Sequence, residues 1–238
     1  MEQSGTTTRL AGAVQGLSSE LVSALRSGGQ FRLAGTVSGS DGTEVPADLA
    51  LAAVRVMGAD AVLPSVLRRT PLEADDLGVF SRTVHAYPPP ADAAPTSAWS
   101  HWAMTRALRR LDASLDDTPE PDHDGQPTAA WLDDASWQSL THQLAVLAPL
   151  AVPGEDCAVA RAARGRPVDV ARGFVRAVRR RDWLQAAGAG RWLVLLDGVP
   201  DTLGLEAGLD FVALMGADDS RVALQIQAAR LMRTGAPV

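Results

Sequence analysis

The stretch AGAGRWLVLLDGVPD, residues 187–201, constrains the fold more than any other part of this sequence. Two glycines lead into an apolar run that ends on Asp197, and such a run fits either a buried strand or a core helix. A strand ending on an aspartate is typical of the metal-binding strand of nucleotide hydrolases. A helix would instead place the chain in the mainly α class.

The absence of lysine weighs against the strand. All 22 basic residues are arginine, so the lysine of a phosphate-binding P-loop is missing, as are Schiff-base and general-base lysines. The glycines at 188 and 190 also fail as a dinucleotide fingerprint, because a third glycine is lacking and they precede the apolar run instead of following a strand. The sequence therefore offers Asp197 no phosphate-binding loop.

The flanking residues favour a helix over 183–196. Asp182 is a good N-cap, and Gly198 with Pro200 follows the run in the order expected after a helix. Each glycine inside the run costs about 1 kcal/mol relative to alanine, and close packing against a neighbouring helix would compensate. We predict a core helix here; a strand would overturn the fold prediction and reopen the nucleotide question.

Helical spacing of apolar residues recurs along most of the chain. It is clear over 8–27, where leucine and valine stand three or four positions apart. Further helical patterns lie at 47–57, 97–115, 129–149, 155–164, 167–181, 201–215 and 219–233. Phe31, Leu33 and Val37 alternate with small or polar residues, so the pattern also allows a small β-hairpin near residues 31–46. The predicted fold class is mainly α, with a multi-helix, bundle-like core.

The clearest interruption is PPPADAAPTS, residues 88–97. Its four prolines cannot continue a helix or a central strand. We therefore predict a proline-rich linker between an N-terminal helical segment, residues 1–87, and a C-terminal helical domain, residues 98–238. The alternative is one continuous domain.

Composition indicates a globular protein of the cytoplasm. The chain is 46% hydrophobic and 21% charged, as globular proteins are. Its start, MEQSGTTTRL, lacks the basic and apolar regions of a signal peptide, and the sequence shows no stretch that we interpret as a membrane span. Abundant alanine, glycine and valine without lysine indicate a GC-rich bacterial genome. We expect a cytoplasmic protein with no membrane association.

Charge is segregated in the second half of the chain. Residues 111–160 contain ten acidic residues and no arginine, whereas 161–181 contain eight arginines and one acid, Asp169. Such segregation indicates either a binding surface or internal pairing between the two stretches.

The helix predicted over 167–181 carries part of this arginine cluster on one face. Helical spacing predicts an inward stripe made of Val168, Ala171, Val175 and Val178. The outward face then holds the candidate binding residues Arg172, Arg176, Arg179 and Arg180. Guanidinium groups pair in bidentate fashion with carboxylates and phosphates, so a protein partner or an acidic ligand is expected. The alternatives are a solvated face, pairing with the protein's own acidic loop at 116–128, and nucleic acid, against which the net charge of −6 argues.

A second candidate site is a small-molecule pocket around His101. This histidine begins a helical stripe that continues through Met104, and Trp99 and Trp102 flank it. The alternative is a core histidine whose hydrogen bonds are satisfied. No cofactor is indicated, and no metal site either, since Cys157 is the single cysteine and His101 has no histidine three or four positions on.

Two functional hypotheses follow. The leading one is a cytoplasmic, helical accessory or regulatory protein that binds a protein or acidic ligand through the arginine-rich face. The alternative is a small-molecule enzyme of specialised metabolism with a Trp/His-lined pocket near His101. A homo-oligomer is a further expectation, because the many small residues permit close helix packing. The sequence does not decide whether the protein is an enzyme and identifies no reaction, ligand or partner.

Overall fold

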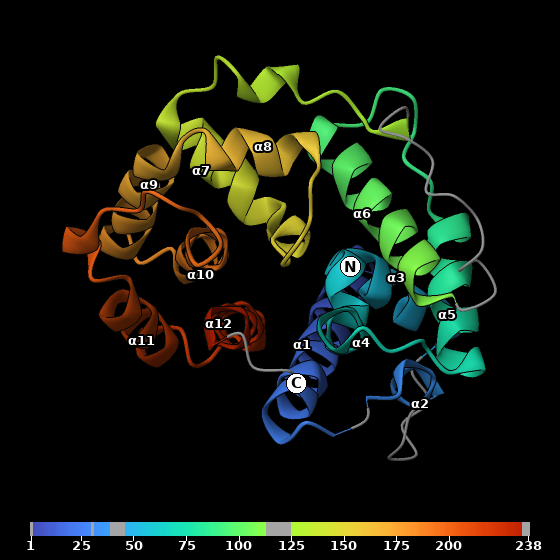
Figure 1. The fold of residues 1–238 in the computed structure, drawn as a ribbon. Coiled ribbons are helices and arrows are strands. Elements are labelled where there is room, and N and C mark those ends of the chain that lie inside the picture. Colours follow the sequence, from blue (N-terminus) through green and yellow to red (C-terminus); the bar gives the residue numbers. More distant parts are fainter. Residues whose placement is uncertain (1, 30, 39–45, 113–124, 235–238) are drawn as a thin grey trace. The chain divides into compact units, whose positions relative to one another are not determined.

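The computed structural model describes residues 2–29, 31–38, 46–112 and 125–234 (Figure 1). Every regular element in these ranges is helical and none is a strand, so the mainly α prediction is confirmed. The chain divides into two compact units, each described by itself below. They are residues 1–93 with 100–120, and residues 94–99 with 121–237.

The first unit is built around the long helix α1. Its elements are α1 (Glu2–Ser27), α2 (Leu33–Ser38), α3 (Ala47–Met57), η1 (Gly58–Val62), α4 (Leu63–Arg68), α5 (Ala74–Ala86) and the part of α6 (Pro95–Leu111) from Ser100 on. Helix α1 packs against α3, which in turn packs against α5. The predicted stripe of α1 is buried from Val14 to Leu25, and Gly28 follows the helix with a φ of 67°.

The predicted hairpin is wrong where the structure describes it. Residues Leu33–Ser38 form helix α2, while 39–45 lie outside the described residues. The helix is stabilised from a distance, because the backbone N–H of Ala34 donates to Asp76 Oδ1 on α5 at 2.8 Å. Leu33 itself is 1% exposed. Another helix therefore supplies the hydrogen-bond acceptor for the N-terminus of α2. Such an acceptor cannot be recognised from the local alternation of apolar and polar residues.

The stretch Ala47–Arg68 is long and apolar enough to cross a membrane, by length and composition alone. It covers α3, η1 and α4 in 22 residues, and its most apolar window of 18 residues has a mean hydropathy of 1.6. Of its most apolar window, 61% is buried inside the protein, and a core helix of this length passes the same test. Location in the cytoplasm remains a prediction.

The second unit surrounds a central helix, α10. Its elements are η4 (Ala130–Leu132), α7 (Trp137–Val146), η5 (Ala148–Leu150), α8 (Ala158–Arg164), α9 (Pro167–Arg179), α10 (Trp183–Leu193), η6 (Asp201–Leu203), α11 (Leu205–Met215) and α12 (Ser220–Thr234), preceded by the start of α6. Helix α10 packs against α7, α9, α11 and α12, which lie around it in Figure 1. The predicted helices over 155–164, 167–181, 183–196 and 219–233 are present with slightly different ends. The one predicted over 129–149 is divided into η4, α7 and η5, and the one over 201–215 into η6 and α11.

The stretch AGAGRWLVLLDGVPD enters helix α10 as predicted, although the helix ends at Leu193 and not at residue 196. The Asp182 side chain accepts a hydrogen bond from the backbone N–H of Gln185 at 3.2 Å, which is the geometry of an N-cap. Gly198 has a φ of 76°, and Asp197 is exposed beyond the end of the helix. The nucleotide interpretation of Asp197 is therefore not supported by the fold.

The two glycines of α10 permit close helix contacts. A Cβ on Gly188 would lie 2.8 Å from the carbonyl oxygen of Ala145 on α7, and one on Gly190 would lie 2.5 Å from Leu209 Cδ2 on α11. Each glycine thus compensates its unfavourable helix propensity through tighter packing.

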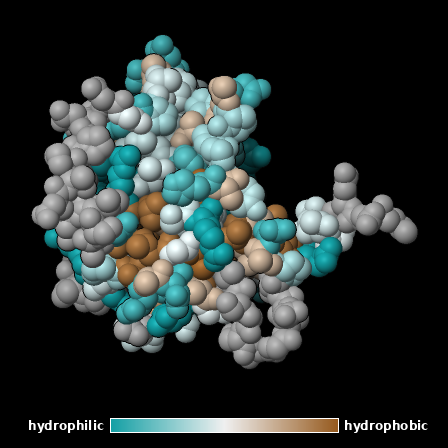
Figure 2. Space-filling model, turned by 90° about the vertical axis from the view of Figure 1, so that its right-hand side faces the viewer, coloured by the Kyte–Doolittle hydropathy of each residue, from teal (hydrophilic) through white to brown (hydrophobic). Residues whose placement is uncertain are grey.

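The surface is not uniformly polar. Figure 2 shows one face of the molecule on which hydrophobic residues gather in one area beside hydrophilic ones. Independently of that view, the exposed large apolar side chains of the second unit include Val168 and Val175 on α9 and Phe211, Leu214 and Met215 on α11. The two valines belong to the candidate site.

Candidate functional site

Helix α9 presents a different face to the core from the one its sequence predicts. Ala171 is buried as expected, but Val168 and Val175 are 51% and 42% exposed, so the predicted inward stripe is wrong for these two; Val178 is half-buried. The buried face consists of Val170, Ala171, Gly173, Phe174 and Ala177. Burying a phenylalanine removes more apolar surface from water than burying a valine. The face of α9 that carries Phe174 therefore packs against the core in place of the face with Val168 and Val175.

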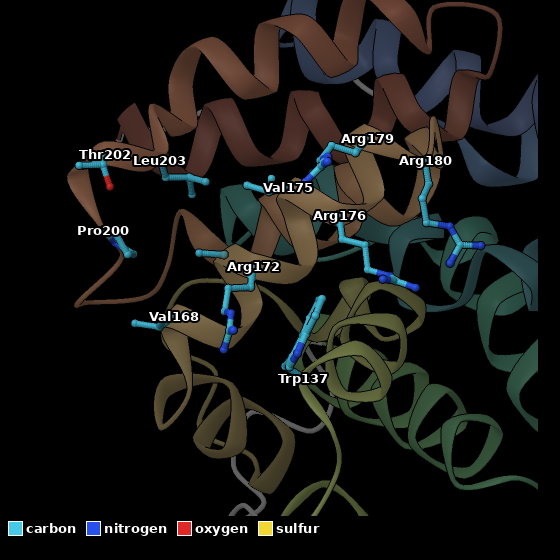
Figure 3. Close-up of a pocket in the computed structure, with 11 residues that line it drawn as sticks. Trp137, Val168, Arg172, Val175, Arg176, Arg179, Arg180, Pro200, Thr202 and Leu203 are labelled. Atoms are coloured by element: carbon cyan, nitrogen blue, oxygen red, sulfur yellow. The ribbon is translucent and has the colours of Figure 1, made fainter.

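The outward face of α9 forms the floor of one open groove. All four predicted arginines are exposed and line it. The groove has a volume of about 780 Å³ and is lined by Trp137, Val168, Ala171, Arg172, Val175, Arg176, Arg179, Arg180, Pro200, Thr202 and Leu203. We call it the α9 groove (Figure 3).

An indole ring lies against two of the four guanidinium groups. Trp137 is the first residue of α7, and its ring centroid lies 5.5 Å from Cζ of Arg172 and 5.7 Å from Cζ of Arg176. Figure 3 shows the ring between these two side chains. Such cation–π contacts use the face of a guanidinium and leave its N–H edges available for an acceptor. The ring therefore restrains both arginine side chains, and both remain exposed to solvent.

A glycine of α9 brings the tryptophan to this position. A Cβ on Gly173 would overlap the side chain of Thr141 on α7, so only glycine permits the two helices to approach this closely. The Thr141 hydroxyl donates to the carbonyl oxygen of Trp137 at 2.8 Å. Trp137 stands one helical turn before Thr141, and the contact at Gly173 thus places its ring beside the arginines.

The opposite wall of the groove is mainly apolar, with one hydroxyl group on Thr202. It is formed by Pro200, Thr202 and Leu203, in and beside η6, and it faces the side of α9 that carries Val168 and Val175 (Figure 3). The groove therefore joins an apolar side to a cationic side along one helix.

The arginines before the groove pair with the protein's own acceptors. Arg164 and Arg161 contact Asp156 at 2.9 and 3.5 Å, and Arg166 contacts Asp169 at 2.6 Å. The hydrogen bond from Arg164 lowers the pKa of Asp156, and the charges of both arginines act in the same direction. These pairs lie at the N-terminal end of the cluster. Residues 116–124 of the acidic loop, with which the arginine face was alternatively expected to pair, lie outside the described residues.

The arginines of the groove have few such partners. Arg172 lies 3.8 Å from Asp169, a long ion pair on a side chain that is 62% exposed. Within the described ranges, no acidic side chain lies within 4.0 Å of Arg176, Arg179 or Arg180. The groove therefore presents four cationic groups, and three of them have no acidic partner in the part of the chain that the structure describes.

The residues of the second predicted site are engaged in packing. Trp99 is fully buried and its indole N–H donates to the carbonyl oxygen of Thr128 at 3.0 Å. His101 Nε2 lies 3.1 Å from the carbonyl oxygen of Val84, and it must donate because a carbonyl only accepts. Trp102 is half-buried. This geometry favours the core-histidine alternative, and a pocket near His101 remains a prediction.

Metal-binding geometry is not found in the described part of the chain. No group of three His, Cys, Asp or Glu side chains is arranged there to hold an ion. Cys157 is buried, and its sulfur accepts the backbone N–H of Ala160 at 3.4 Å, so it caps α8.

Two parts of the groove were missing from the sequence prediction. Trp137 continues the apolar stripe of Leu140 and Leu144, so spacing alone places it in the core, whereas the structure leaves it half-buried. Its position directly after the N-cap Ser136, at the very end of the stripe, is the signal that could have shown this. The wall at 200–203 contains no residue type that indicates binding.

Comparisons of the chain with protein-family models, curated proteins and solved structures found no match. The functional inference therefore rests on the residues of the α9 groove.

Proposed function

We propose that this protein is an accessory or regulatory protein that binds an acidic protein partner in the α9 groove. One observation supports this above the others: four arginines converge on one groove, and three of them have no acidic partner in the described part of the chain. An uncompensated row of cations attracts carboxylates and disfavours basic surfaces, so it gives specificity and fast association.

The contacts of Trp137 strengthen the attraction for carboxylates. Because Arg172 and Arg176 already rest on its ring, they lose less side-chain freedom when an acceptor binds their edges. A single exposed ion pair contributes at most about 1 kcal/mol. Several pre-positioned arginines in one groove are therefore needed, and the groove supplies four.

The openness of the groove favours a protein over a small molecule. Sites for small ligands bury most of the ligand in a concave, largely apolar cavity. Here the floor is exposed, with Val168 half in solvent and Arg172 more than half exposed. Nucleic acid is disfavoured because phosphates make no use of the valines or of Leu203, and the chain carries a net charge of −6.

The proposal is tested with a fluorescent chain of about 15 glutamates, which is acidic and unfolded. The groove variant is Arg172→Gln/Arg176→Gln/Arg180→Gln. The matched control removes the same charge elsewhere, in Arg26→Gln/Arg82→Gln/Arg109→Gln, where all three arginines are exposed on other helices. Binding is measured by fluorescence anisotropy at low and physiological salt.

Wild type and control should bind the probe equally, and the groove variant should bind at least about ten-fold more weakly. Added salt should weaken binding to the wild type. Equal losses in groove variant and control would show general electrostatics and overturn the proposal. Tighter binding to a single-stranded oligonucleotide than to the glutamate probe would overturn the choice of a protein partner.

A further inference from the structure

We infer that the partner's segment is an amphipathic acidic helix, which lies along α9 with its carboxylates on the arginines and its apolar side chains on the valines. This inference rests on the proposed function and specifies the class of partner. It is carried by the arrangement of two rows of side chains on one helix face.

The cationic row has a regular spacing. Arg172 and Arg176 on α9 and Arg180, the C-cap of this helix, stand four positions apart, which corresponds to a rise of about 6 Å between successive members. In Figure 3 Arg176 and Arg180 lie on the Trp137 side of the helix. Carboxylates at positions i, i+4 and i+8 of a second helix repeat at the same interval.

The apolar row runs beside the cationic one. Val168 and Val175 stand seven positions apart, about 10.5 Å along the axis, and both lie toward Pro200 and Leu203 in Figure 3. Apolar side chains at i and i+7 of a partner helix have this separation. Both valines are exposed, so only an apolar partner surface would remove them from water.

The two adjacent rows of side chains on α9 favour a helical partner segment over an extended one. Successive side chains of a strand point to opposite sides, so a strand offers one row to a flat surface. A helix offers neighbouring stripes of different character on one side, as in helix-in-groove recognition. The groove is lined by helix and loop residues and by no strand edge among the described residues, so it offers no edge for backbone pairing.

The test compares two peptides of about 15 residues with identical composition and designed helicity. The first carries glutamates at i, i+4 and i+8 and leucines on the adjoining stripe. The second permutes these residues around the helix. A third peptide contains the protein's own residues 116–128, which are acidic and proline-bearing. Binding is measured by calorimetry to wild type, to the groove variant above, and to Val168→Ser/Val175→Ser.

The amphipathic peptide should bind wild type about ten-fold more tightly than the permuted one or the 116–128 peptide. The double serine variant should lose this preference while still binding the permuted peptide. The groove variant should bind neither the amphipathic nor the permuted peptide with the wild-type affinity. Circular dichroism checks that each variant is folded. Equal affinities for all three peptides would overturn the inference while the proposed function stands. If neither these peptides nor the glutamate chain binds, the proposed function itself fails.

Discussion

The eight arginines of residues 161–181 look alike in the sequence, but the structure places seven of them in two different regions. At the N-terminal end, Arg161, Arg164 and Arg166 bind the protein's own carboxylates and carbonyl oxygens. In the α9 groove, Arg172 has one long ion pair and the others have no acidic partner among the described residues. A cluster of like charges can therefore combine internal structure with an open surface, and contacts distinguish the two where composition does not.

The two regions meet at Asp169. Arg166 binds this carboxylate at 2.6 Å and also donates to the carbonyl oxygen of Ala135 at 2.7 Å, whereas Arg172 approaches the carboxylate only to 3.8 Å. The same acid thus belongs to the structural region and contributes little to the groove. Because Arg166 and Arg172 both neighbour Asp169, the same substitution at each of them tests the difference between the two regions.

The largest effect is expected for Arg166→Ala. It removes several hydrogen bonds at a half-buried site, leaves Asp169 and a backbone carbonyl without their donor, and should lower the free energy of unfolding by about 2–3 kcal/mol. The matched variant Arg172→Ala should cost no more than about 0.5 kcal/mol, because this side chain is mostly exposed. Urea unfolding measures both.

Binding should show the opposite order. Arg172→Ala should weaken binding of the glutamate probe, whereas the affinity of Arg166→Ala for the probe should stay within about three-fold of wild type. If the two substitutions changed stability and binding in parallel, the division into a structural and a binding region would be wrong.

A smaller effect is expected for Gly173→Ala. The added methyl group would meet Thr141 and force α7 away from α9, which should cost about 1–2 kcal/mol after the gain in helix propensity. Because Trp137 would move with α7, binding of acidic peptides should weaken as well. Thermal unfolding and anisotropy provide the measurements.

The control for this substitution is Gly16→Ala on α1, where no atom lies within 4 Å of the added Cβ. It should be neutral or stabilising by up to about 1 kcal/mol. Unchanged peptide binding by a folded Gly173→Ala variant would mean that the position of Trp137 is not needed in the groove.

The smallest effect is a pH dependence at Asp156. Its pKa is lowered by Arg164, so the stability from this ion pair is fully present above the pKa of an unfolded aspartate and is lost as the pH falls through the lowered value. The melting temperature of wild type should exceed that of Asp156→Asn slightly between about pH 5 and 8, and the difference should shrink below about pH 4. Asp134→Asn, at an exposed aspartate, is the control. A difference that grows toward low pH would contradict the assignment.

The sequence predicted the helices well where local signals and packing agree. In α10 the N-cap Asp182, the glycines and the apolar run all indicate one element, and the structure contains it. The signals failed at Leu33–Ser38, because the alternation there resembles a strand while the stabilising acceptor, Asp76, comes from another helix. Local pattern cannot report a contact between residues so far apart in the chain.

The candidate site was predicted in part. The outward position of the four arginines follows from helical spacing, and the structure brings all four to one groove. The valines were assigned inward because two apolar stripes compete on α9, and spacing does not weigh the greater area of Phe174. The role of Trp137 depends on the approach of two helices at Gly173, which only the packed structure shows.

The groove's charge comes entirely from guanidinium groups in a chain that contains no lysine. Acetylation and ubiquitination of lysine side chains, common ways to switch off a cationic surface, therefore have no target on this surface. Methylation of an arginine would keep its charge but block bidentate hydrogen bonds. Control of the proposed interaction by covalent modification would fall most directly on the partner, for example by adding phosphate beside its carboxylates.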